Sequence, residues 1–303
     1  MRKIILFIAL SCSVVISNAC PICGCGGGNL YIGLFPNFNS KFIGVRYHYS
    51  QFHTQLANDP TQFSNNNYNS VELYGGFNVG KKIKIIAFVP YYSNKQMDDD
   101  GTMYMKGLGD ITVMGQYKIL DIVKNAAGKN VAQQQLWIGG GLKLPTGYFN
   151  VNPKDTNTTI ADINMQLGTA SVDFILNGLY TYSVGNFGLN ATATYKVNTA
   201  NSDNYKYGNK LSTNCIAYYK LNKNHTTISP NIGIGYETIN NNTLSGSKIQ
   251  YTGSHVTTAL AGIEFGFNKI GLGINTQIPI EQNFAEGQTQ LKLKAMAHLT
   301  FSL

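Results

Sequence analysis

The last fourteen residues of the chain alternate between apolar and polar side chains. One parity holds Leu291, Leu293, Ala295, Ala297, Leu299, Phe301 and Leu303, and the other holds Gln290, Lys292, Lys294, Met296, His298, Thr300 and Ser302. Successive side chains of a β-strand point to opposite faces, whereas a helix would spread this pattern over its whole surface. The segment therefore predicts a strand with one face suited to lipid and the other to water.

The same alternation recurs along the chain in segments of about ten residues, which is typical of transmembrane barrels. We predict twelve strands, near 41–50, 68–80, 83–93, 108–120, 134–145, 170–184, 186–199, 209–222, 226–239, 254–267, 269–280 and 288–303. Long polar connections alternate with short turns, as in bacterial barrels whose short turns face the periplasm. An even number of strands then places both termini in the periplasm.

Composition excludes other classes of protein. Charged residues make up 13% of the chain, against about a quarter in soluble domains. After residue 20 no run approaches the ~18 apolar residues of a membrane-spanning helix. The chain has no dense basic block that would indicate a nucleic-acid partner. We therefore expect an all-β, antiparallel up-and-down barrel in the bacterial outer membrane, with lipid as its surroundings.

The first forty residues differ from the rest. Residues 1–19 have the basic start, apolar run and small-residue end of a secretory signal peptide. Residues 20–40 are rich in Cys and Gly, and we expect a periplasmic segment or plug. Residues 41–303 form the predicted barrel.

Cys20, Cys23 and Cys25 lie within six residues. Three such thiols suit a soft ion such as Cu or Zn, or a redox cycle. The simpler alternative is a periplasmic disulfide. Zinc sites usually have four ligands from two separated pairs, and no second pair follows. We therefore expect no cofactor, with Cu or Zn at this cluster as the alternative.

Three motifs resemble those of a known family. They are Gly107-Leu108-Gly109-Asp110 before a strand, the run from Gly141 to Gly147 after one, and the run from Gln166 to Asp173 before the next. In combination they are similar to the outer-membrane transporters named for the meta-pathway of phenol degradation. The resemblance runs from about residue 40 to the end, and it implies a transport barrel. The cysteine cluster is not part of that family's general pattern.

Strand parity also predicts which side chains line the lumen. The predicted charged lumen residues are Arg46, Glu72, Lys84, Asp110, Lys118, Lys143, Asp173, Lys196, Lys220, Glu237, Glu264, Lys292 and Lys294. Apolar residues of the same parity are Phe88, Trp137, Ile175 and Leu179. Buried ions must be paired or hydrated. These charges therefore predict either a structural ion-pair network or a polar conduit whose slight positive excess favours anions or polar solutes.

One pair of residues raises an enzymatic alternative. His48 and Ser50 share a strand face, as in outer-membrane phospholipases, but here parity turns them inward. We therefore expect no enzyme and no catalytic residues. The favoured function is a channel or transporter for passive uptake of a small-molecule solute, and the alternatives are a metal-handling barrel and a closed structural barrel. The oligomeric state is left open.

Overall fold

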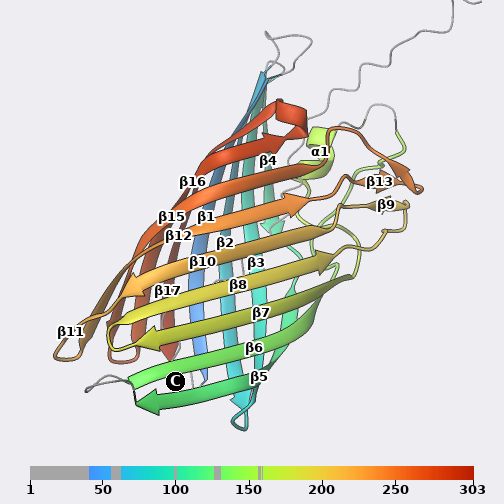
Figure 1. The fold of residues 1–303 in the computed structure, drawn as a ribbon. Coiled ribbons are helices and arrows are strands. Elements are labelled where there is room, and N and C mark those ends of the chain that lie inside the picture. Colours follow the sequence, from blue (N-terminus) through green and yellow to red (C-terminus); the bar gives the residue numbers. More distant parts are fainter. Residues whose placement is uncertain (1–40, 56–62, 99–100, 126–130, 156–157, 159) are drawn as a thin grey trace, which may run out of the picture.

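The computed structural model describes residues 41–55, 63–98, 101–125, 131–155, 158 and 160–303. Twelve antiparallel strands close into a barrel, because β1 pairs with β17 and β10 pairs with β12 (Figure 1). These strands are β1 (Phe42–Gln55), β2 (Phe63–Val79), β3 (Ile83–Asp98), β5 (Thr112–Asn125), β6 (Val131–Lys143), β7 (Asp173–Val184), β8 (Phe187–Val197), β10 (Lys210–Tyr219), β12 (Thr226–Ile239), β15 (Ser254–Phe267), β16 (Ile270–Phe284) and β17 (Thr289–Ser302). The predicted all-β barrel of twelve strands is confirmed.

Several shorter strands and two short helices lie outside the twelve wall strands. They are β4 (Gly101–Leu108), β11 (Leu221–Lys223), the three-stranded sheet of β9 (Tyr205–Lys206), β13 (Thr243–Leu244) and β14 (Ser247–Lys248), and the helices α1 (Ile160–Met165) and η1 (Ala285–Gly287). No helix in the described ranges has the length and apolar character needed to cross a bilayer. The predicted signal peptide, residues 1–19, and the segment 20–40 lie outside the described residues.

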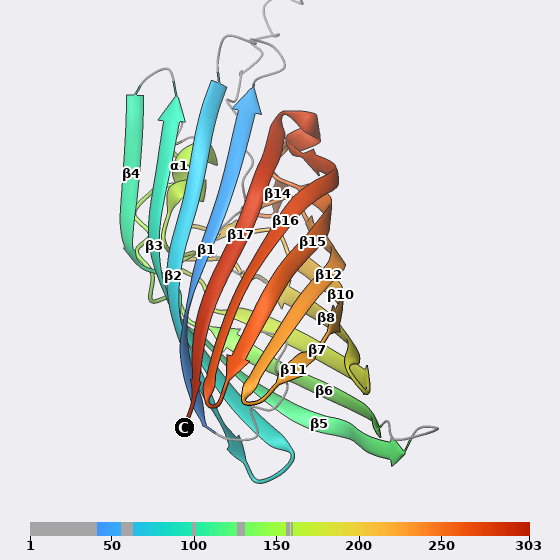
Figure 2. The same ribbon diagram turned by 90° about the vertical axis from the view of Figure 1, so that its left-hand side faces the viewer.

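Short turns gather at one end of the barrel. β2 and β3, β7 and β8, and β15 and β16 are joined there, and Ser302 of β17 pairs with Phe42 at the start of β1. Figure 2 shows the C-terminus at this end. Bacterial barrels turn their short connections to the periplasm, so this is the periplasmic end.

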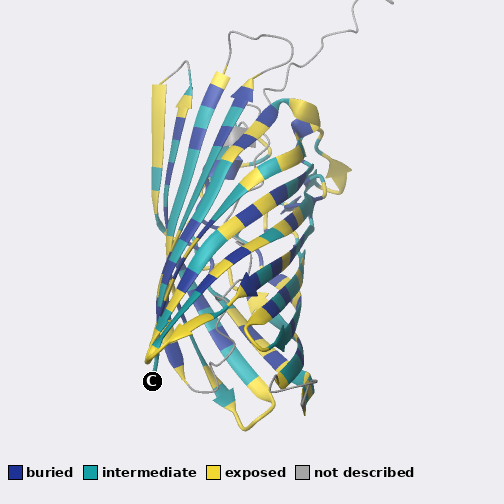
Figure 3. Cartoon of the chain, turned by 60° about the vertical axis from the view of Figure 1, so that its left-hand side comes forward, coloured by how far each residue is buried: buried dark blue, intermediate teal, exposed yellow. Residues whose placement is uncertain are grey.

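The outer surface of the barrel is apolar. Buried and exposed residues alternate along much of the wall (Figure 3), and exposed aliphatic residues such as Ile232, Ile234 and Ile274 occupy the outer face. Exposed aromatic residues form two girdles: Phe77, Tyr117, Phe187, Tyr219, Phe267 and Phe301 toward the periplasmic end, and Tyr47, Tyr91, Tyr195 and Tyr236 toward the other. An apolar band between two aromatic girdles is the lipid-facing surface of an outer-membrane barrel.

Strands β1 to β4 rise above the rest of the wall (Figure 2). β3 runs to Asp98, five residues beyond its predicted end, and its upper half pairs with β4, which the sequence did not predict. β4 continues the line of β5 along β3, with residues 109–111 between them. Pro90 of β3 lies opposite this break. Because proline has no N–H to donate, it interrupts the ladder at this point.

The predicted alternation fails in the upper part of β17. Leu293 pairs with Gln51 and Leu291 pairs with Phe52, so Lys292 is the extra residue of a β-bulge. The bulge reverses the parity: Leu291 is buried, whereas Lys292, predicted to line the lumen, is exposed. The side-chain oxygen of Gln282 accepts the Leu291 N–H at 2.7 Å, which replaces a backbone partner.

Substitutions on opposite faces of β8 test which face of the wall points toward lipid. Ala193 lies on the exposed face and Thr192 on the inner face. We expect Ala193→Arg to lower the free energy of unfolding by about 2 to 4 kcal/mol in lipid vesicles, and Thr192→Arg to lower it by less. Equal losses in urea titrations of the two variants would contradict the assigned faces.

Candidate functional site

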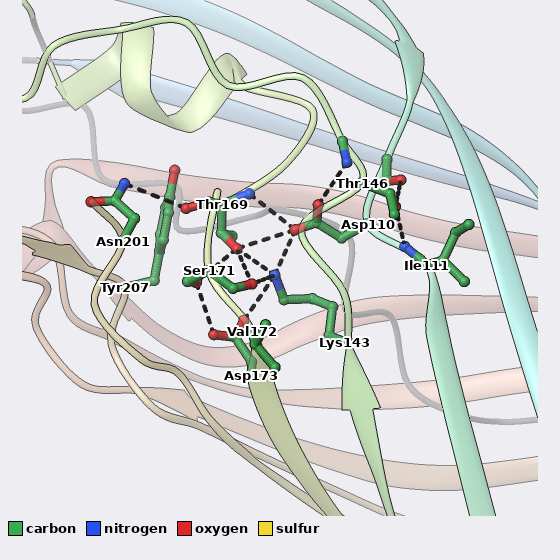
Figure 4. A network of polar contacts seen from close by, with 12 residues as sticks. Asp110, Ile111, Lys143, Thr146, Thr169, Ser171, Val172, Asp173, Asn201 and Tyr207 are labelled. Carbon is green, nitrogen blue, oxygen red and sulfur yellow. Dashed lines mark hydrogen bonds and ion pairs between the residues drawn. The ribbon is translucent and has the colours of Figure 1, made fainter. Parts of the chain in front are cut away.

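The carboxylate of Asp110 holds both ends of the connection between β6 and β7. The break between β4 and β5 places Asp110 inside the wall, where its side chain is buried. Its Oδ1 accepts the N–H of Gly147 at 2.9 Å, and its Oδ2 accepts the N–H of Thr169 at 3.0 Å (Figure 4). One side chain therefore anchors a segment of more than twenty residues at its first and last turns.

Lys143, the last residue of β6, links this anchor to the next strand. Its ammonium nitrogen lies 2.5 Å from Oδ2 of Asp110 and 2.9 Å from Oδ2 of Asp173, the first residue of β7. Asp173 also accepts the Ser171 hydroxyl and the Thr199 N–H, both at 3.0 Å. All three charged side chains are at most 8% exposed. Buried ions of this kind persist because each has partners of opposite charge and further hydrogen bonds.

The three motifs that resemble the transporter family meet at this anchor. Thr146 donates its hydroxyl to Gly109 O at 3.0 Å and accepts the Ile111 N–H at 2.9 Å, so it satisfies the backbone at the break (Figure 4). A Cβ on Gly168 would lie 2.6 Å from Gly147 O and 2.7 Å from Oδ1 of Asp110. The glycine thus allows the two ends of the connection to touch.

The connection itself packs over the end of the barrel opposite the short turns. Ile163 of α1 forms a buried cluster with Tyr205 and Tyr207, against which Leu244 and Ile249 pack. The Tyr207 hydroxyl donates to Ile163 O at 3.1 Å. Residues from three connections, after β6, β8 and β12, therefore form one apolar cap.

A second ion pair lies deeper in the lumen. Arg46 of β1 pairs with Glu72 of β2, and both are buried. The Arg46 guanidinium also lies 5.0 Å from the ring centroid of Phe88 and 5.6 Å from that of Tyr74. Arg46 therefore has an acidic partner and two aromatic rings.

Two further carboxylates of the lumen are paired. Glu237 lies 3.0 Å from the ammonium nitrogen of Lys210 and 3.4 Å from that of Lys294. Glu264 lies 2.9 Å from Nε2 of His298. We did not predict Lys210 or His298 as site residues, although both have the inward parity of their strands. That parity was the signal that could have identified them.

Trp137 of β6 lies beside two lysines. The ammonium nitrogen of Lys84 is 4.5 Å from the Trp137 ring centroid, and that of Lys118 is 5.0 Å away. Asp121 pairs with Lys118 at 2.7 Å and is 40% exposed. A bulge between Lys118 and Leu120 reverses the parity, so Asp121 lies opposite Gln135 and accepts a hydrogen bond from the Gln135 amide at 3.1 Å.

The other predicted positions are more scattered. Lys196 and Lys220 are half-buried, and the Lys220 ammonium lies 5.6 Å from the ring centroid of Tyr218. His48 and Ser50 are half-buried on the inner face of β1. The cysteines Cys20, Cys23 and Cys25 lie outside the described residues. Within the described ranges, no group of three or more His, Cys, Asp or Glu side chains is placed to hold a metal ion.

Comparison with solved structures identifies the fold. An outer membrane channel from Pseudomonas putida F1 superposes with a TM-score of 0.62 and 14% identity, over 88% of this chain and 96% of that chain. The β-domain of the Bordetella autotransporter BrkA gives a TM-score of 0.48 and 10% identity, over 87% and 100% of the two chains. No protein-family model and no curated protein matches the sequence. The chain has the fold of an outer-membrane channel barrel.

A substitution of Lys143 tests whether its ion pairs with Asp110 and Asp173 stabilise the barrel. Lys143→Met removes the cation between Asp110 and Asp173 and leaves two buried carboxylates facing each other. Removing one partner of a buried ion pair costs about 3 to 5 kcal/mol. We expect a loss of that size in the free energy of unfolding, measured by denaturant titration in vesicles.

The control is Lys292→Met at the exposed bulge, which should change stability by no more than about 0.5 kcal/mol. A Lys143→Met variant as stable as this control would contradict the role of the anchor.

Proposed function

We propose that the protein is a passive outer-membrane channel for small molecules. Its apolar outer face suits lipid, and its inner face carries ion pairs and amides. A polar interior within an apolar wall is the arrangement of water-filled barrels. Uptake through such a lumen requires only a solute gradient.

Buried polar atoms of the lumen carry this proposal. His48 Nε2, Asn190 Oδ1, Ser229 Oγ and Asn231 Oδ1 are buried without a hydrogen-bond partner among the described residues. A buried polar group without a partner costs free energy, and internal water commonly satisfies it. These atoms lie on β1, β8 and β12, so we infer that water reaches several parts of the inner wall.

Side chains narrow the conduit. Phe42, Tyr74, Ile86, Phe88, Met114 and Ile175 form one buried apolar cluster, and Ile216, Tyr218, Leu260 and Met296 form another. Barrels of eight strands are filled by side chains, whereas those of sixteen are open channels. A twelve-stranded barrel with these clusters suits small solutes.

We also propose the finer family assignment, to the transporters named for the meta-pathway of phenol degradation. Its support is that the three motifs behind the resemblance meet around the Asp110 carboxylate. Motifs far apart in sequence that build one anchor act as a unit, which strengthens a resemblance based on their combination.

Conductance measurements in planar bilayers test whether the protein forms a channel. The refolded protein should give single-channel steps smaller than those of a sixteen-stranded porin recorded in the same salt. Heat-denatured protein is the control. A bilayer that stays silent after repeated insertion, with folding verified by circular dichroism, would contradict the proposal.

Gly168 tests whether the anchored connection restricts the pore. In Gly168→Ala the new methyl group would press on Gly147 O and Asp110, so the connection must move. We expect larger and noisier conductance steps. Gly178→Ala is the control, because a Cβ there meets nothing within 4 Å. Conductance traces of Gly168→Ala that match those of Gly178→Ala would show that the connection does not restrict the pore.

A further inference from the structure

We infer that Lys84, Lys118 and Trp137 form a binding site for small anions on the inner wall, of the class to which carboxylate-bearing solutes belong. The inference rests on the proposed function, because the site would determine which solutes the channel favours. The three residues come from the neighbouring strands β3, β5 and β6.

Both lysines converge on one ring. Their ammonium nitrogens lie within 5.0 Å of the centroid of Trp137, a distance at which the ring face attracts a cation. Trp137 is 5% exposed, so it forms a firm backing for both cations. Two like charges held this close repel each other, and an anion between them would relieve that repulsion.

Lys84 forms no ion pair with a carboxylate of the described residues. The ion pairs of the described chain assign the lumen carboxylates to Arg46, Lys143, Lys210, Lys294 and His298, and Asp121 to Lys118. Of the undescribed segments, 1–40 and 126–130 contain no Asp or Glu, whereas 56–62 and 99–100 contain Asp59, Asp99 and Asp100. Within the described ranges, Glu72, Asp110, Asp173, Glu237 and Glu264 thus each have a cation partner, whereas no ion pair occupies the ammonium group of Lys84.

The neighbouring wall supplies polar groups. Gln116 lies opposite Lys84 in the strand register, two residues before Lys118. Its amide donates to Asn177 Oδ1 at 2.6 Å, which fixes the Gln116 side chain against the wall. The site therefore combines two cations, an indole ring and a held amide, and this set suits a small carboxylate better than a metal cation or a neutral sugar.

The fluorescence of Trp137 provides the measurement, because Trp137 is the single tryptophan of the chain. A quencher that reaches the ring lowers this fluorescence. Iodide, an anionic quencher, and acrylamide, a neutral one, would be titrated at constant ionic strength into the refolded protein. Lysines that attract anions raise the local iodide concentration. We expect Lys84→Gln to lower the iodide quenching constant by roughly threefold or more, with the acrylamide constant unchanged.

Two further variants sharpen the test. Asp121→Asn removes the partner of Lys118, and it should raise the iodide quenching constant. Lys292→Gln, at the exposed bulge, should leave it unchanged. In the wild-type protein, acetate should compete with iodide and reduce the quenching. A general loosening of the fold would not lower the iodide quenching constant in Lys84→Gln and raise it in Asp121→Asn.

Iodide and acrylamide constants that change in parallel, or an iodide constant unaffected by Lys84→Gln, would overturn the anion site. In bilayers under a KCl gradient, the reversal potential should be anion-selective and shift toward cations in Lys84→Gln. Channels that conduct without this selectivity would contradict the site but not the channel. Selective quenching without conductance would support the site and contradict the channel.

Discussion

The need to pair every backbone N–H and C=O group inside lipid governs this structure. Lipid offers no hydrogen bonds, so a sheet that crosses it must have no free edge. The pairing of β1 with β17, the two ends of the wall in sequence, removes that edge. The alternation of side chains follows from closure, because each strand then has one face toward lipid and one toward the lumen.

Closure creates a second problem, since it places charged side chains in a confined interior. The structure pairs the carboxylates of the inner wall with cations from other strands, as in Arg46 with Glu72 and Lys210 with Glu237. Both of these pairs join neighbouring strands of the wall, β1 with β2 and β10 with β12. The electrostatics of the lumen and the register of the wall therefore depend on each other. Lys84, which has no such partner among the residues that the structure describes, is an exception to this arrangement.

Period-two alternation was enough to predict the twelve wall strands, and β12 and β15 begin and end at the predicted residues. It failed at Lys292, because a bulge depends on how β17 pairs with β1 and β16, which a single segment does not record. It also missed β4, whose residues are mostly exposed on both faces and so do not alternate. Parity could not predict that Asp110, Lys143 and Asp173 contact one another. It assigns each residue to a face, whereas the contact depends on which strands lie side by side.

The Asp110 anchor has a consequence for motion. One carboxylate receives N–H groups from both ends of the connection between β6 and β7, and Lys143 ties the same carboxylate to β7. Either end can leave only by uncovering a buried charge that also holds the other. Loss of the contact at one end therefore weakens the contact at the other, because the two ends of the connection are coupled through a single buried side chain.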